Sequence, residues 1–344
     1  MNILVIGGTN FIGPYVVHQL AKHGHQVMVF HRGKTQADLP PSVQHIYGDR
    51  AQLPDYQDVF YKFAPDVVLD MIAYTETEAQ TVVDLFKGHA RRIVVISSQD
   101  VYRAHDIIWK VETDILDPTP LSEDSPLRSR RYPYRDRPEV RGDFPADYDK
   151  ILVEQAYQNE PQLPATVLRL PMVYGPGDYR HRFQAYLKRM DDCRPAIVLE
   201  TGMANWRGSY GYVENVAAAI ALTITDERAT GHVYNISEPD SLSEAELITM
   251  MGQQVNWQGQ VIKVPASQMP SSWQAVANTE QHWTTDSTRL RQELGFAEKL
   301  SMQEALQRTL TWERTAPQSS FVHNPTLLEY DAEDIVLASL AYKA

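Results

Sequence analysis

The chain has 344 residues, 43% of them hydrophobic, and a formal net charge of −12 from 44 acidic and 32 basic residues. This content permits a large core in one domain or two unequal lobes, and the negative charge argues against a generic polyanion-binding protein. Its one cysteine, Cys193, excludes an internal disulfide framework, and the longest later apolar run, 216–224, is too short to span a bilayer, so we expect a soluble cytoplasmic protein.

The first thirteen residues, MNILVIGGTNFIG, predict a strand, a glycine turn and the start of a helix. Such a turn lets the backbone approach a pyrophosphate closely while free amides at the helix N-terminus face the anion. The spacing is near G-x-x-G-x-x-G, with Asn10 at the middle glycine, and Asn tolerates a left-handed backbone well. We predict a dinucleotide site, rather than only a tight connection, formed by Gly7, Gly8, Thr9, Asn10, Phe11, Ile12 and Gly13.

Strand-like and helix-like stretches alternate through the first half of the chain. The expected strands are 26–32, 43–49, 65–74, 91–98 and 165–175, and the helical stretches between them include 77–87 and 150–158. Near-continuous apolar strands separated by helices favour a parallel sheet covered on both faces. The predicted fold class is α/β, a Rossmann-type doubly wound parallel sheet with a smaller C-terminal substrate-binding lobe.

After Gly175 the alternation loosens. We expect a last strand at 232–237, a helix from about Ser243, two helical segments within 285–313, and a tail whose end, 334–342, is helical. The predicted domains are an NAD(P)-binding Rossmann domain (1–174 and 207–237), a substrate-binding lobe (175–206 and 238–316) and a C-terminal extension (317–344).

The end of the second predicted strand bears on the choice of dinucleotide. In such folds an acid at this place bonds the ribose 2′-hydroxyl, whereas an arginine accepts a 2′-phosphate. Here the strand ends Phe30-His31-Arg32-Gly33-Lys34 without an acid, so Arg32 and Lys34 favour NADP(H), with NAD as the alternative, unless they form only a solvated basic turn. Asp49 is a candidate for the adenine amino group, and Ala73 permits close passage of the cofactor. No metal site is predicted.

Seven segments occur in the order seen in one enzyme superfamily: GGTNFIG, VVISSQDVYR, KILVE, RLPMVYGPGD, WRGSYGYVENVA, VYNISEPDSLSEAEL and TDSTRLRQELGF. Together they resemble the extended short-chain dehydrogenase/reductase superfamily, and within it the NAD-dependent epimerase/dehydratase branch, over residues 1–313. The resemblance implies a Ser/Thr, Tyr, Lys triad beside the nicotinamide. A lysine lowers the tyrosine pKa from about 10, so that the phenol can exchange a proton with a substrate hydroxyl.

Two members of that triad have counterparts here. Ser98, four residues before Tyr102, matches the hydroxyl that polarises the substrate oxygen, and its alternative role is a strand-end serine bonded to backbone. Lys150, four residues before Glu154, matches the lysine that binds the nicotinamide ribose.

The tyrosine departs from the family pattern. Tyr-x-x-x-Lys requires a tyrosine at 146, which is Ala146, and Tyr148 lies only two residues before Lys150. In a regular helix that offset is about 200° of rotation, but Asp147 is a plausible N-cap, so Tyr148 near the helix start is the assigned catalytic phenol. A loop tyrosine, Tyr132, Tyr134 or Tyr74, is the alternative, and a third possibility is altered or lost chemistry.

The motif Ser98-Gln99-Asp100 bears on reaction type. Sugar dehydratases of this family resemble Thr-Asp-Glu at this place and use both acids to eliminate water, so the absence of the first acid favours epimerisation or carbonyl reduction. Asp100 is expected to be a loop acid bonded to backbone rather than a catalytic residue.

The expected substrate is small and anionic. Arg207 resembles the arginine that grips a nucleotide-sugar diphosphate, with a structural ion pair as the alternative. Arg180, followed by His181 and Arg182, is expected to flank the same cleft. An arginine-rich stretch, 128–141, either lines this cleft or forms a solvated loop.

Two functional hypotheses follow. The first is an NAD(P)-dependent epimerase or reductase acting on a sugar nucleotide or related polar carbonyl or hydroxyl compound, with a homodimer as the family's expected assembly. The second is a dinucleotide-binding redox sensor or RNA-binding factor, because GGTNFIG resembles chloroplast-type stem-loop RNA-binding relatives and arginines alternate with tyrosines in 128–141. Bulk charge argues against nucleic acid.

Overall fold

A seven-stranded parallel sheet organises the computed structural model, which describes residues 1–112, 115–137, 142, 144–316 and 328–341. The strand order is β10-β6-β5-β4-β1-β2-β3, so the N-terminal strand lies inside the sheet. β2 and β3 follow on one side of β1, and the later strands are added on its other side. This confirms the doubly wound α/β class. The strands are β1 (Asn2–Ile6), β2 (Gln26–His31), β3 (Gln44–Tyr47), β4 (Val67–Asp70), β5 (Arg92–Ser98), β6 (Ala165–Leu170) and β10 (Val233–Asn235).

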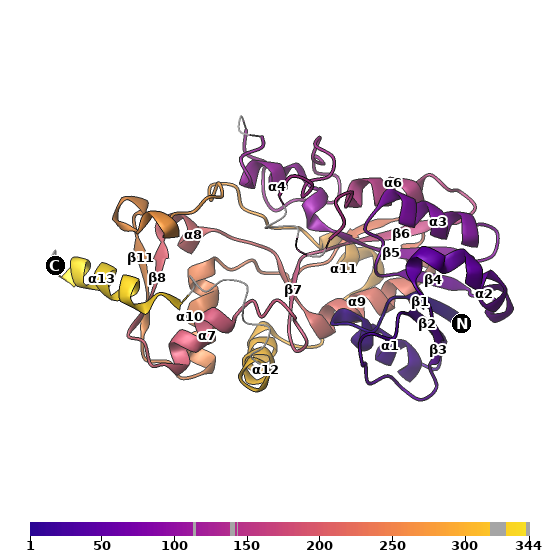
Figure 1. Cartoon of the computed structure of the whole chain (residues 1–344), viewed down its shortest axis with the longest axis horizontal. Coiled ribbons are helices and arrows are strands. Elements are labelled where there is room, and N and C mark those ends of the chain that lie inside the picture. The colour runs from indigo at the N-terminus through magenta and orange to yellow at the C-terminus, as the bar shows by residue number, and fades with distance from the viewer. Residues whose placement is uncertain (113–114, 138–141, 143, 317–327, 342–344) are drawn as a thin grey trace.

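Helices cover both faces of the sheet (Figure 1). One apolar core joins the sheet to α1 (Ile12–Lys22) and α9 (Val213–Thr225), and a second joins the other face to α2 (Gln57–Phe63), α3 (Glu76–Phe86) and α6 (Lys150–Gln158). Because both faces are buried, the inner strands are nearly continuous runs of apolar residues, as the sequence indicated, whereas the edge strand β3 is largely exposed. Shorter helices complete this part: η1 (Arg50–Tyr56), η2 (Gln99–Val101), α4 (Arg103–Ile108), η3 (Glu227–Ala229) and α11 (Thr288–Leu294).

The remaining elements form a smaller lobe at the opposite end of the molecule (Figure 1). A two-stranded parallel sheet lies there, and the C-terminal helix packs on it through Val336 against Val198 and Val264. Its elements are α7 (Gln184–Asp191), β8 (Ala196–Glu200), α8 (Thr201–Asn205), α10 (Glu244–Gln254), β11 (Gln260–Val264), η4 (Ala266–Gln268), η5 (Ser271–Trp273), α12 (Met302–Thr315) and α13 (Tyr330–Ala341).

Two details differ from the sequence expectation. The strand expected at 165–175 is two strands, because Pro171 has no N–H to continue the ladder, and β7 (Met172–Tyr174) instead pairs with β9 (Tyr210–Tyr212). The helical tail, α13 (Tyr330–Ala341), begins earlier than the predicted 334–342, whose last residue lies outside the described ones. Within the described residues, the structure contains no helix with the length and apolar character needed to traverse a bilayer. The domain boundaries stay a prediction.

Candidate active site

The glycine turn between β1 and α1 has the shape that an approaching pyrophosphate needs. Gly7 and Gly8 have φ of 96° and 82°, and a Cβ on Gly13 would lie 2.4 Å from the carbonyl carbon of Gly8. No side chain fits at Gly13, so the first turn of α1 comes directly against the loop, with its free amides at the carboxyl end of the sheet. These residues fit a dinucleotide phosphate.

Backbone strain in this turn falls on a residue that differs from the expected one. Asn10 is not in the left-handed region. Phe11, directly before α1, has φ of 45°, which side chains rarely adopt. The amide of Gly13 donates to the Asn10 carbonyl at 2.9 Å, so the turn closes on Asn10 by backbone alone. Strain of this kind is maintained only where the surrounding structure requires it, and here it lies beside the predicted phosphate site.

The predicted adenosine side of the site is basic and open. Arg32 and Lys34 are exposed directly after β2. Asp49 is also exposed, and its carboxylate accepts the amide of Ala51 at 3.0 Å as the cap of η1. Ala73 is fully buried at the same edge of the sheet, one strand beyond β1.

Lys150 lies deep at the carboxyl edge of the sheet. Its ammonium donates to the carbonyl of Ala73 at 2.6 Å and to that of Ile96 at 2.8 Å, so it bridges the ends of β4 and β5. Burial lowers the pKa of Lys150 to about 8, against the opposing influence of Asp70 and Asp100. The lysine is thus held beside the strand end that carries Ser98.

Ser98 ends β5 and is half-buried. Its hydroxyl oxygen accepts the amide of Asp100 at 3.2 Å and so caps η2, which is the backbone role considered as the alternative. That bond uses a lone pair and leaves the hydroxyl hydrogen available, so capping and polarisation of a substrate oxygen are compatible.

Asp100 gathers two tyrosines, which the sequence did not indicate. The Tyr148 hydroxyl donates to Asp100 Oδ2 at 2.8 Å, and the Tyr134 hydroxyl donates to the same oxygen at 3.1 Å. The expectation that Asp100 bonds backbone through its side chain was therefore wrong. Its other oxygen, Oδ1, is buried without a hydrogen-bond partner among the described residues. Burial, and then the Asp100 charge, raise the pKa of both phenols well above 10.

The start of α6 explains where Tyr148 lies. Asp149, not Asp147, is the N-cap: its carboxylate accepts the amides of Ile151 at 2.9 Å and Leu152 at 3.4 Å. Tyr148 therefore precedes the helix, and the helical rotation between positions 148 and 150 does not apply. Tyr148 is almost fully buried against Asp100, whereas Tyr134 is half-buried.

Most of the described arginines in the stretch 128–141 contact other residues of the chain rather than only solvent. Arg128 is buried and forms an ion pair with Asp149 at 2.9 Å, and its Nε donates to the Asp100 carbonyl at 2.9 Å. Arg135 lies over the Tyr132 ring and Arg137 over Trp109. Arg141 lies outside the described residues.

The predicted substrate arginines differ in their surroundings. Arg207 pairs with Glu246 at 2.9 Å and donates to the Ser241 carbonyl at 2.6 Å, which is the structural ion pair considered as its alternative. Arg180 is exposed beside Tyr179. Arg182 is tied to Asp178 and to the Val173 carbonyl.

Comparison with protein families places the chain. The model of the NAD dependent epimerase/dehydratase family matches residues 3–122 and 148–237, which is more than half of the sequence. The chain therefore belongs to this family.

Curated relatives are distant and differ in activity. A chloroplast stem-loop binding protein of 41 kDa from Arabidopsis thaliana is 26% identical, and the match covers 68% of this chain and 58% of that protein, less than two thirds of its length. The 2′-dehydrokanamycin reductase of Streptomyces kanamyceticus is 24% identical over 88% of this chain and 79% of that protein.

Solved structures show the same fold. A dTDP-glucose 4,6-dehydratase from Bacillus anthracis in complex with NAD has a TM-score of 0.68 at 18% identity, covering 92% of this chain and 98% of that one. A UDP-glucose 4-epimerase from Thermotoga maritima with UDP-glucose has a TM-score of 0.65 at 18% identity, covering 92% and 99%.

Proposed function

We propose that this family member is an NADP(H)-dependent epimerase or reductase that acts at a hydroxyl or carbonyl carbon of a polar, sugar-nucleotide-like substrate. One observation carries the proposal: the buried ammonium of Lys150 bridges the ends of β4 and β5 beside Ser98, on the sheet edge where the glycine turn ends. A dinucleotide with its pyrophosphate at that turn would extend along this edge.

The protein's own residues supply binding and proton chemistry, while the nicotinamide supplies the hydride acceptor or donor. Lys150 would hold the ribose, and Ser98 would donate its hydroxyl hydrogen to the substrate oxygen. Because Ala146 provides no phenol, the proton would pass through a tyrosine held by Asp100.

Tyr148 and Tyr134 are both candidates for that phenol. Tyr148 is the residue assigned from the sequence, and Tyr134 is the more exposed of the two. A phenolate beside the Asp100 carboxylate is unfavourable, as the raised pKa values indicate. A tyrosine that accepts the substrate proton would therefore pass its own proton to Asp100, so that the carboxylate is the final acceptor.

The substrate class rests on charge and on the named ligands of similar structures. Two such structures contain UDP-glucose or UDP-glucuronic acid with NAD. In this chain Arg180 is exposed, and Arg207 would exchange Glu246 for a diphosphate oxygen.

A binding protein without turnover is the second candidate, and the similarity to a stem-loop binding protein favours it. The engagement of Arg128, Arg135 and Arg137 in internal contacts weighs against an RNA surface on that loop.

Calorimetric titration with NADP⁺ and NAD⁺, followed by nicotinamide absorbance with UDP-glucose and UDP-glucuronic acid, tests the proposal. We expect NADP⁺ to bind and Lys150→Met to abolish turnover. Absence of binding by both dinucleotides would refute the proposal. Dinucleotide binding together with salt-dependent RNA binding that is lost in Arg130→Ala/Arg131→Ala/Arg135→Ala would favour the second candidate.

A further inference from the structure

Two histidines lie in contact next to the predicted ribose site: His31 is the last residue of β2, and His45 is the second residue of β3. The strands pair in parallel, with Val29 opposite His45 and His31 opposite Tyr47. His31 Nε2 lies 2.9 Å from His45 Nδ1, and the amide of Gly33 donates to His31 Nδ1 at 3.3 Å. His31 is 9% exposed, whereas His45 is exposed.

These contacts assign the ring protons. A backbone amide only donates, so Nδ1 of His31 carries no hydrogen and its Nε2–H donates to His45 Nδ1. The ring hydrogen of neutral His45 is therefore on its exposed side, at Nε2. In the neutral pair the Nδ1 of each ring accepts one hydrogen bond, from the Gly33 amide at His31 and from His31 Nε2 at His45. Protonation of either Nδ1 breaks the hydrogen bond that it accepts.

Charges around the pair are mainly basic. Arg32 and Lys34 follow β2, and Tyr47, whose ring is 4.9 Å from that of His31, lies beside it on β3. The acids on the adjoining segments are Asp38, in the loop after Lys34, and Asp49, whose carboxylate caps η1. Burial, and then His45, lower the pKa of His31. The two hydrogen bonds of the pair, from the Gly33 amide to His31 and from His31 to His45, are those of two neutral rings.

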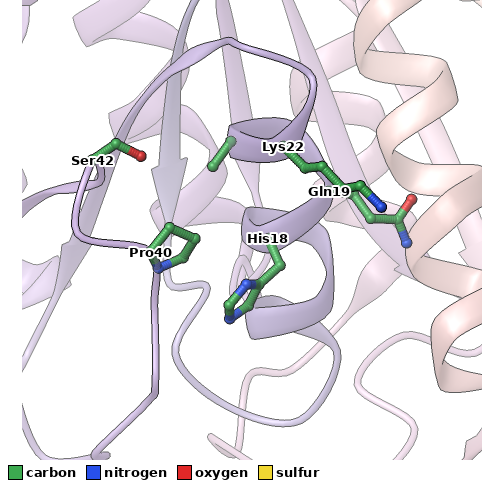
Figure 2. Close-up of a pocket in the computed structure, with 6 residues that line it drawn as sticks. His18, Gln19, Lys22, Pro40 and Ser42 are labelled. Carbon is green, nitrogen blue, oxygen red and sulfur yellow. The ribbon is translucent and has the colours of Figure 1, made fainter.

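The loop that carries Lys34 is hydrogen-bonded to α1 through Asp38, four residues after Lys34. His18 Nε2 donates to the carbonyl of Asp38 at 2.7 Å. Figure 2 shows the pocket that this arrangement leaves between α1 and the loop, with His18, Gln19 and Lys22 on one side and Pro40 and Ser42 on the other. The segment after β2 is thus fixed at both ends.

We propose that His31 and His45 belong to the binding site for the ribose 2′-phosphate of NADP(H), and that the pair takes up a proton from solvent when this phosphate binds. The inference rests on the proposed NADP(H) function. His31 stands at the strand end where NAD-specific folds place an acid, and the phosphate oxygens would replace the hydrogen bond that protonation breaks. A dianion beside the pair favours the charged imidazole, which then supplements Arg32.

Calorimetry with NADP⁺ and NAD⁺ at pH 6.5 and 8.5 tests this, in two phosphate-free buffers of different ionisation enthalpy. We expect the wild-type Kd for NADP⁺ to be about tenfold lower at pH 6.5, with proton uptake, because one charge-assisted hydrogen bond is gained. NAD⁺ should show neither effect. His45→Gln and His31→Gln should abolish the pH dependence, whereas His23→Gln, an exposed histidine at the end of α1, should preserve it.

Comparison at equal pH removes the contribution of the phosphate's own titration, since every variant meets the same ligand. NADP⁺ binding without proton uptake, or with the same pH dependence in His45→Gln, would overturn the inference and leave the proposed function intact. NAD⁺ binding with NADP⁺ excluded would overturn both the inference and the NADP(H) assignment. Failure of both dinucleotides to bind would overturn the proposed function itself.

Discussion

Replacing Asp149 by alanine should strongly destabilise the protein, because this buried carboxylate joins the start of α6 to the loop that carries Arg128 and Tyr132. It caps α6 through the amides of Ile151 and Leu152, pairs with Arg128, and accepts the Tyr132 amide at 2.8 Å. Loss of the cap costs about 1 kcal/mol. Leaving the Arg128 guanidinium buried without its partner costs about 3–5 kcal/mol, so we expect about 4–6 kcal/mol in total. That is a large fraction of the roughly 5–15 kcal/mol of a typical domain.

Urea unfolding at pH 7.5, followed by circular dichroism, measures this loss as a lower midpoint at constant slope. Asp226→Ala is the matched control: Asp226 also caps a short helix and pairs with an arginine, Arg228, but that pair is solvent-exposed. The control should lose only about 1 kcal/mol, the contribution of the cap, because an exposed ion pair adds little. The double variant Arg128→Met/Asp149→Ala should regain part of the loss. A loss below about 2 kcal/mol in Asp149→Ala would show that the buried pair contributes no more than a helix cap.

Three further outcomes follow from the site. Gly13→Ala should abolish NADP⁺ binding in a calorimetric titration, since its Cβ would overlap the backbone of Gly8; retained affinity would show that the turn adapts. Tyr134→Phe should lower kcat by about 100-fold with an unchanged Kd for NADP⁺, and Tyr148→Phe much less, if Tyr134, the less buried of the two residues, transfers the proton; the reverse order would assign that role to Tyr148. Because burial lowers the pKa of Lys150 to about 8 from its ordinary 10.5, the unfolded chain binds more protons between these values. Wild-type stability should therefore rise relative to Lys150→Met by about 2 kcal/mol from pH 7.5 to 9.5 in urea unfolding, and a constant difference would contradict the lowered pKa.

Elements defined by local patterns were predictable from the sequence. The buried strands were predictable because both faces of a parallel sheet require apolar side chains. The helix expected from about Ser243 begins at a capping box between Ser243 and Glu246. The glycine turn and the position of Lys150 at the start of α6 also follow from short-range spacing.

The features that the sequence did not predict depend on contacts between segments that are distant along the chain. Asp147 and Asp149 are equally good caps locally, and Arg128, 21 residues earlier, pairs with Asp149. Tyr134 reaches Asp100 across 34 residues, and His45 reaches His31 from the next strand. No periodicity or spacing rule encodes such pairings, which depend on how a loop or strand edge packs. The positive φ that the sequence pattern suggested for Asn10 falls instead on Phe11, directly before α1.

The packing of α13 on β8 and β11 has a consequence for synthesis. Glu333, on that helix, pairs with the buried guanidinium of Arg189 at 2.6 Å, and Val336 covers Val198 and Val264. Residues 330–341 leave the ribosome after all of these partners, so the smaller lobe exposes an unpaired charge and apolar strands until translation reaches them. A polypeptide truncated before this helix would keep the complete dinucleotide turn but leave the apolar strands of the smaller lobe uncovered. Chaperones and proteases recognise exposed apolar surface of this kind.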